Sequence, residues 1–188
     1  MENPATVLPK SKIRGTIIVT TFVSVGNATQ PFDRLIEAVL RIASRLPQPV
    51  IVQHGNTLLQ CTGCISRPFM EMTEFSQHVE KAELLILHAG AGSVIQAIQA
   101  GKVPVVMPRR AKYGEHVDDH QLEFARALAE MGKVVVAEEP EDLIIAIEEA
   151  RKRQGMAHAL NKRPPLVDLI DETLREYAKT FEKATTQD

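Results

Sequence analysis

The feature that most constrains the fold is a continuous apolar run that leads into a short turn of small residues. Residues 84–87 have the composition of an inner strand of a parallel sheet, and Gly90 and Gly92 follow in the turn. We expect a helix to begin near Ser93. The amides at the start of such a helix, together with the positive end of its dipole, favour a bound anion such as a phosphate. The segment therefore predicts an anion-binding turn between a buried strand and a helix.

The spacing of this turn leaves the identity of the ligand open. Ile95 stands where a dinucleotide-binding fingerprint has its third glycine, and the Gly-Lys-Ser/Thr ending of a P-loop is absent. An alternative interpretation is that Gly90 and Gly92 serve only the close packing of a strand against a helix.

Size and composition limit the class of protein. The chain has 188 residues, 44% of them hydrophobic, and a formal net charge of -2, which favours one well-buried domain and gives no basic surplus for nucleic acid binding. No apolar run approaches the roughly 20 residues of a membrane-spanning helix, and residues 1–12 have no apolar signal core. We therefore predict a cytoplasmic protein. We expect a disordered N-terminus over 1–15, one domain over 16–155, and a linker with a C-terminal helix over 156–188.

The two cysteines, Cys61 and Cys64, share a spacing that occurs in redox-active dithiols and in half of a zinc site. His54 and His78 are the candidates to complete a metal site, but the chain has no second cysteine pair. Thioredoxin-like motifs open a helix, whereas this pair precedes a strand-like segment at 65–69. We interpret the pair as two reduced thiols in a loop.

Strand-like and helix-like segments alternate along the chain. We expect strands at 16–25, 49–53, 65–69, 84–87, 103–107 and 134–137, and helices at 32–46, 73–82, 94–100, 119–131 and 141–153. This alternation predicts an α/β fold with a mostly parallel sheet and helices on both faces. Ligands of such folds bind beyond the carboxyl ends of the strands.

The C-terminal segment has the pattern of an amphipathic helix over 166–181. Its apolar side chains fall on one helical face: Leu166, Leu169, Ile170, Leu174, Tyr177 and Phe181. Two interpretations stay open, namely that the helix covers its own sheet or that it joins the chain to a partner.

Polar side chains follow the predicted strands at the edge where their carboxyl ends meet. Gly26 and Asn27 follow the first strand and allow a tight turn that faces a ligand, and residues 53–56 follow the second strand. The loop after the fifth strand carries the basic side chains Arg109, Arg110 and Lys112. We expect this loop to place positive charge beside the bound anion.

Three histidines near these loops raise the question of metal binding or acid–base catalysis. The spacing of His88, His116 and His120 matches no known zinc motif. His88 has two possible roles, to orient its loop or to contact the ligand. The acidic pair Asp118 and Asp119 is explained by helix capping as well as by ligand binding.

Four motifs occur in order between residues 16 and 150: VG at 25–26 with PFDRLI at 31–36, VQHG at 52–55, HAGAGS at 88–93 and GEHVDDHQ at 114–121. Together they resemble the C-terminal domain of family 28 glycosyltransferases. Within that group the chain is similar to small bacterial exopolysaccharide glycosyltransferase subunits and to the soluble half of the split dolichol-linked GlcNAc transferase. The resemblance implies a Rossmann-like domain that forms one half of a GT-B fold and holds a UDP-sugar.

The resemblance also implies the roles of individual residues. Backbone amides from Gly90 to Ser93 receive the diphosphate, Gly26 and Asn27 face the sugar-phosphate, and Asp119 and Gln121 contact the donor sugar. Met70 lies where backbone groups pair with the base. Gln96 stands where the group commonly has a glutamate for the ribose hydroxyls, which puts ribose binding in doubt. The candidate donor-binding residues are Gly26, Asn27, Met70, His88, Ala89, Gly90, Ala91, Gly92, Ser93, Gln96, Arg109, Asp119, His120 and Gln121.

The family pattern implies that the catalytic base and the acceptor site lie in a second half, which a membrane-anchored partner subunit supplies in the split members. We expect an inverting transfer of a hexose from UDP to a lipid-linked acceptor in exopolysaccharide or capsule synthesis, with no metal or separate cofactor. The heterodimer would lie at the inner face of the membrane. The alternative hypothesis is a non-catalytic nucleotide-sugar sensor or regulatory subunit.

Overall fold

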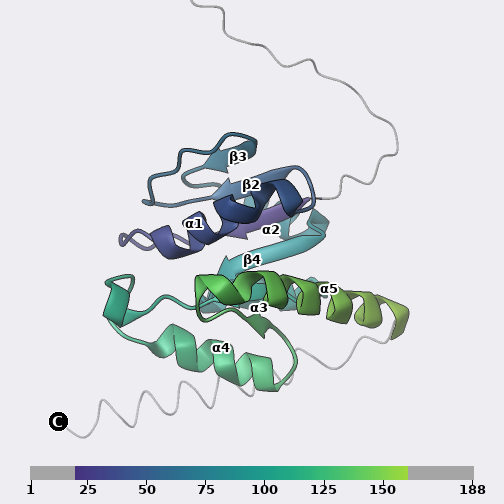
Figure 1. Cartoon of the computed structure of the whole chain (residues 1–188). Coiled ribbons are helices and arrows are strands. Elements are labelled where there is room, and N and C mark those ends of the chain that lie inside the picture. The colour runs from purple at the N-terminus through teal and green to yellow at the C-terminus, as the bar shows by residue number, and fades with distance from the viewer. Residues whose placement is uncertain (1–19, 161–188) are drawn as a thin grey trace, which may run out of the picture.

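The computed structural model describes residues 20–160, with side chains to residue 156. Six parallel strands form one sheet in the order β3-β2-β1-β4-β5-β6 (Figure 1). The strands are β1 (Thr21–Ser24), β2 (Val50–Gln53), β3 (Cys64–Arg67), β4 (Leu84–His88), β5 (Val105–Met107) and β6 (Val135–Val136). The helices are α1 (Asp33–Ile42), α2 (Met72–Lys81), α3 (Ala91–Gln99), α4 (His120–Glu130) and α5 (Leu143–Leu160), with short 3-10 turns at Ala43–Arg45, Ala111–Tyr113 and Pro140–Asp142.

This architecture confirms the predicted α/β alternation, and each of the six strands and of the helices α1 to α5 overlaps an expected segment. Five of the strands are shorter than predicted, because their outer residues run into the connecting loops, whereas β4 extends one residue further, to His88. Helix α3 starts at Ala91 rather than at 94, so Gly92 and Ser93 lie inside its first turn. The glycine turn is therefore the beginning of the helix itself.

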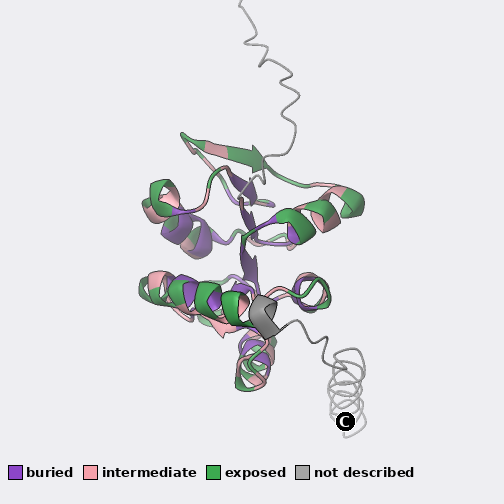
Figure 2. Ribbon diagram, turned by 90° about the vertical axis from the view of Figure 1, so that its right-hand side faces the viewer, coloured by how far each residue is buried: buried purple, intermediate pink, exposed green. Residues whose placement is uncertain are grey.

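Helices cover both faces of the sheet and enclose two apolar cores (Figure 2). Side chains of α1 and α5 pack on one face, where Leu35 and Leu143 are at most 1% exposed. Side chains of α2, α3 and α4 pack on the other face, around Phe22 and Leu87. Every residue of β1, β2 and β4 is buried, which explains their nearly continuous apolar sequence.

The order of the strands reverses between β1 and β4. These strands pair side by side in the sheet, with Ser24 opposite Leu87, although β2 and β3 lie between them in sequence. The loops that follow β1 and β4 run away from each other to opposite sides of this point. In doubly wound folds such a reversal leaves a crevice at the carboxyl ends of the two strands.

Helix α5 corrects one expected boundary. The linker was predicted to begin at residue 156, but the helix continues through Gly155 to Leu160. A glycine inside a helix costs about 1 kcal/mol relative to alanine. The neighbouring Gln154 offsets this cost, because its side chain accepts from the Val103 amide at 2.8 Å and donates to the Gly101 carbonyl at 3.0 Å. The helix predicted over 166–181 and the N-terminal segment 1–15 lie outside the described residues.

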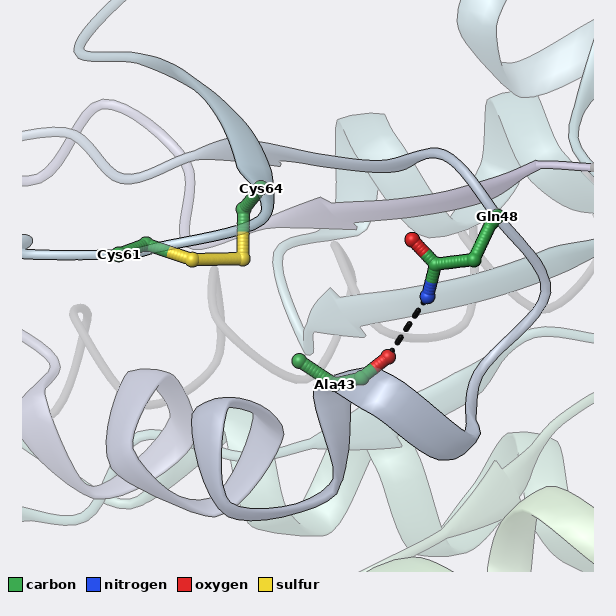
Figure 3. The surroundings of a disulfide bond; sticks show 4 residues. All are labelled: Ala43, Gln48, Cys61 and Cys64. Carbon is green, nitrogen blue, oxygen red and sulfur yellow. Dashed lines mark hydrogen bonds between the residues drawn. A yellow bond between two sulfur atoms is a disulfide. The ribbon is translucent and has the colours of Figure 1, made fainter.

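The interpretation of the cysteines as reduced thiols is wrong in this structure, because Cys61 and Cys64 form a disulfide (Figure 3). Their Cα atoms are 5.7 Å apart, within the range that a disulfide requires. The tight turn before β3 brings them together, and Gly63 adopts a left-handed φ of 94° in that turn. Sequence spacing fixes no backbone path through such a turn, so it did not decide between the two states.

No helix in the range 20–160 is both long enough and apolar enough to cross a membrane.

Candidate functional site

A pocket of about 380 Å³ opens at the carboxyl ends of β1, β2 and β4, beside the point where the strand order reverses. Helices α2 and α3 form its remaining walls. The residues that line it are Ser24, Gly26, Asn27, Gln53, Met70, Met72, Phe75, His88, Gly90, Ala91, Gly92, Ser93 and Gln96. The structure thus brings together nine of the sequence-predicted site residues at one cavity.

The start of α3 forms the floor for an anion. Gly90 is its N-cap and has no side chain to satisfy the first amides, which have no partner inside the helix. A Cβ atom added at Gly92 would meet no atom within 4 Å, so this residue faces open space in the pocket. The amides of Ala91, Gly92 and Ser93 are therefore available to a ligand, with the positive end of the helix dipole behind them.

His88 fills the space that two glycines leave. A Cβ atom built on Gly90 or on Gly26 would overlap the imidazole, so both glycines are needed for packing around this ring. His88 is 9% exposed, and its burial, with a further contribution from the charge of Arg109, lowers the pKa of the imidazole to about 4. The ring is neutral at physiological pH. Position 90 thus requires a glycine because of its packing against His88, whereas a glycine at position 92 leaves the backbone open to a ligand.

A buried polar network shapes the loop after β1. The Ser24 hydroxyl donates to Gln53 Oε1 at 2.5 Å and accepts from the Gly26 amide at 3.2 Å. The Gln53 Nε2 group donates to the carbonyls of Gly26 and Pro68, each at 3.0 Å. These bonds connect the ends of β1, β2 and β3 and hold Gly26 at a left-handed φ of 75°.

Arg109 does not face the pocket as the sequence predicted. Its side chain is fully buried, and its guanidinium lies 4.7 Å from the centre of the Phe32 ring. It donates to the main-chain carbonyls of Val25, Gln30, Pro31 and Glu115 at 2.9–3.3 Å. The sequence did not show that loop carbonyls would surround this charge.

The other two basic residues of that loop are also held by protein groups. Arg110 lies 3.5 Å from Glu138 and 3.8 Å from Asp119, and Lys112 lies 3.2 Å from Glu139. Like Arg109, neither residue lines the pocket. The expected cluster of positive charge beside the anion is therefore replaced by helix amides.

Asp119, His120 and Gln121 lie at the start of α4 and do not line the pocket in this structure. Asp119 accepts from the Ala111 amide at 2.9 Å, and Gln121 accepts from the Arg109 amide at 3.2 Å, so both brace the loop after β5. Ala89 is buried behind the pocket wall.

The N-cap residue of α4 is Asp119, whose side chain makes no capping bond, and the preceding Asp118 contacts the helix start instead. Its carboxylate accepts from the His120 amide at 3.2 Å, at the first residue of α4. It also lies 2.7 Å from the His120 ring and 3.0 Å from the His116 ring. The His120 contact is the main reason why the pKa of Asp118 lies below its usual range.

Sequence reasoning missed four lining residues: Ser24, Gln53, Met72 and Phe75. The available signal was a polar residue at the end of each of two otherwise apolar strands, which marks Ser24 and Gln53. The spacing of Met72 and Phe75 places them on one helical face of α2. Between residues 20 and 160, no group of three or more His, Cys, Asp and Glu side chains is arranged to hold a metal ion.

The strand order and the pocket at its reversal define the doubly wound α/β class, whose members bind nucleotides at this position. A model of the glycosyltransferase family 28 C-terminal domain matches residues 20–173, more than half of the chain. The chain belongs to glycosyltransferase family 28 through this domain. The UDP-N-acetylglucosamine transferase subunit ALG13 of Yarrowia lipolytica is 34% identical over an alignment of 125 residues that covers 60% of this chain and 59% of that protein.

Solved structures show the same fold. The glycotransferase of kitacinnamycin superposes with a TM-score of 0.57 at 18% identity, over 84% of this chain and 41% of that chain. MurG of Acinetobacter baumannii superposes with a TM-score of 0.52 at 21% identity, over 90% of this chain and 58% of that chain. The chain therefore spans about half the length of these structures. The domain has the Rossmann-like fold of one half of a GT-B glycosyltransferase.

The buried neutral His88 predicts a loss of stability in mild acid. As the pH falls below the ordinary value of 6.5, the unfolded chain takes up a proton that the folded chain accepts only near pH 4. The contribution of the neutral His88 to the free energy of unfolding is fully present above pH 6.5 and is lost as the pH falls to about 4. Between pH 7 and pH 5 the free energy of unfolding should fall by about 2 kcal/mol through this group alone. Urea unfolding of the wild type and of His88→Gln at both values measures it, and an equal pH difference in the two proteins would contradict the prediction.

The two glycines of the turn should respond differently to a methyl group. Gly90→Ala places its Cβ atom on the His88 imidazole and should lower the free energy of unfolding by about 1–3 kcal/mol, as overpacking does. Gly92→Ala faces open space inside the first turn of α3, where alanine is the better helix former, so its stability should be equal or higher. Thermal and urea unfolding of the two variants measure the change in the free energy of unfolding. An equal loss of stability in both would show that contact with His88 does not distinguish Gly90 from Gly92.

Proposed function

We propose that this chain binds a UDP-sugar as the donor and is the donor subunit of a two-component inverting glycosyltransferase. The observation that carries the proposal is the start of α3, which opens unpaired amides and the bare backbone of Gly92 into a pocket at the strand reversal. A sugar diphosphate there receives hydrogen bonds from the helix amides. Bonds of this kind to a charged group contribute about 1.5–3 kcal/mol each.

The shape of the pocket supports a nucleoside diphosphate. Met70, Met72 and Phe75 line the pocket and provide an apolar surface for a base. The start of α3 supplies the anion site, so phosphates and base have separate places in one cavity. The name of the Yarrowia lipolytica relative, a UDP-N-acetylglucosamine transferase subunit, supports uridine as the nucleoside.

The same amides suit the chemistry of sugar transfer. When the bond between the sugar and the diphosphate breaks, negative charge grows on the leaving diphosphate, and fixed helix amides stabilise that charge without reorganisation. Inversion also requires a base that activates the acceptor hydroxyl. The pocket lining contains no aspartate or glutamate within the described residues, and its histidine, His88, is buried and neutral. We assign the base and the acceptor site to a partner subunit.

Exposed apolar side chains at the same edge of the sheet support such a partner. Leu58 follows β2 and is 93% exposed, and Val117 follows β5 and is 81% exposed. Both loops extend from the carboxyl ends of their strands, on the side where the pocket opens. We propose that a membrane-anchored subunit covers them and brings a lipid-linked acceptor, in exopolysaccharide or capsule synthesis, and that the transferred sugar is a hexose. The complex would lie at the cytoplasmic face of the membrane.

The absence of a carboxylate from the described pocket lining also favours a second candidate, a nucleotide-sugar sensor that binds the donor without catalysis. The two candidates differ in the product of the reconstituted pair. Transfer of label from a UDP-sugar to a lipid fraction, dependent on both subunits, supports the enzyme, and UDP-sugar binding without any transfer supports the sensor.

Calorimetric titration of the purified chain tests the binding site. We expect UDP to bind more tightly than adenosine or guanosine diphosphate. Gly92→Val puts a branched side chain into the space above the α3 amides and should weaken UDP binding at least tenfold, which corresponds to about 1.4 kcal/mol. Circular dichroism of the variant controls for folding. No preference for UDP, or unchanged affinity in a folded Gly92→Val protein, would disprove the assignment.

Substitutions at the exposed loops test the partner. Leu58→Asp together with Val117→Asp should abolish co-purification with the membrane subunit, because burying two carboxylates at an interface is strongly unfavourable. The melting temperature and UDP affinity of the isolated chain should stay unchanged. Met156→Asp, at an exposed position near the far end of α5, is the matched control. Loss of association with the control but not with the loop variant would place the interface elsewhere.

A further inference from the structure

A short chain of hydrogen bonds links the pocket side of α3 to α2. Gln96 Nε2 lies 2.5 Å from the Ser76 hydroxyl oxygen, and that hydroxyl lies 2.8 Å from the Met72 carbonyl oxygen one turn earlier in α2. Gln96 lines the main pocket and also a second cavity of about 300 Å³ between the two helices. Ser76 lines the second cavity only, so the Gln96–Ser76 bond stands between the two spaces.

Proton counting fixes the direction of this chain. A carbonyl oxygen only accepts, so the single hydroxyl proton of Ser76 must go to Met72. Ser76 must then accept from Gln96, and the end of the amide that faces Ser76 must be the NH₂ group. The Gln96 Oε1 atom is left as an acceptor on a side chain that lines the pocket. Ser76 thus sets which half of the Gln96 amide the pocket receives.

The position of Gln96 along α3 indicates which part of a ligand it meets. Gly92 and Gln96 are four residues apart and lie on one face of the helix, about 6 Å apart along its axis. The phosphates lie at Gly92 in the proposed function, and the apolar surface for the base is formed by Met70, Met72 and Phe75. In a nucleoside diphosphate the ribose joins these two parts, so the sugar ring of the nucleoside lies beside Gln96.

We infer that Ser76 is a positioning residue that holds Gln96 Oε1 ready to accept a hydrogen bond from a ribose hydroxyl, and so makes the site selective for ribonucleotides over deoxyribonucleotides. The inference rests on the proposed function, since it requires a nucleoside diphosphate in the pocket. A carboxylate at this position would offer acceptors in either orientation. An amide presents its oxygen to the ribose only when a neighbouring group fixes which end of the amide faces the pocket. Ser76 is this neighbouring group.

Calorimetric titration with UDP, 2′-deoxy-UDP and 3′-deoxy-UDP tests the inference. Wild-type protein should bind UDP about 3- to 10-fold more tightly than one of the two deoxy analogues, the range that one net hydrogen bond gives. Ser76→Ala should bring this ratio close to one by weakening UDP, with the affinity for that deoxy analogue unchanged. Ser76→Thr keeps the hydroxyl and should restore the ratio. Gln77→Ala, at the next and exposed position of α2, is the control and should keep the wild-type ratio.

A second variant separates positioning from a general change in the helix. Gln96→Glu supplies two acceptor oxygens that need no orientation, so adding Ser76→Ala to it should leave the ribose preference unchanged. Retention of the wild-type ratio in Ser76→Ala, or equal binding of all three ligands by wild type, would overturn the inference while leaving the proposed function in place. No binding of UDP by the wild-type chain would instead overturn the proposed function.

Discussion

The buried guanidinium of Arg109 is the interaction on which the carboxyl edge of the sheet depends. A charge without water is stable only where polar groups surround it, and here main-chain carbonyls of two loops provide them, with the Phe32 ring against one face. Burial lowers the pKa of Arg109 to about 10, so the group stays charged at neutral pH. Opening either loop would remove some of the carbonyl partners of this charge. The loops after β1 and β5 are therefore held in one arrangement.

Next to Arg109, the pair Arg34 and Glu115 fixes the loop after β5 to α1. The Arg34 guanidinium donates to both carboxylate oxygens of Glu115, at 3.0 and 2.8 Å, and Glu115 also accepts from the Arg110 amide. Glu115 is 5% exposed, so this bidentate pair is largely withdrawn from solvent. The charged side chains of the loop are thus used to hold its backbone. The pocket is left with groups that carry no formal charge at neutral pH: helix amides, the Ser24–Gln53 network and the neutral His88.

This division explains how much the sequence could predict. Runs of apolar residues marked the strands, and the glycine turn after β4 marked the pocket, because both signals are local. The partners of Arg109 are not local: Val25 lies 84 residues away, and carbonyl acceptors leave no trace in side-chain identity. We predicted from its charge alone that Arg109 would lie beside the ligand. In the structure, the backbone amides at the start of α3 occupy that place instead. The Cys61–Cys64 disulfide was missed for a related reason, since spacing gives no backbone path for the turn.

The fixed loops also bear on how one domain could carry the proposed donor site. The groups that form the pocket come from β1, β2, β4, α2 and α3, and hydrogen bonds within the domain hold the side chains of Ser24, Gln53 and Gln96. Preorganised amides need no second half to be aligned, so donor binding and acceptor activation are separable problems. The loops after β2 and β5 leave apolar side chains exposed, at Leu58 and Val117. A partner that covers this surface would meet the donor in a fixed orientation, and its base could then act on an acceptor without first ordering the nucleotide site.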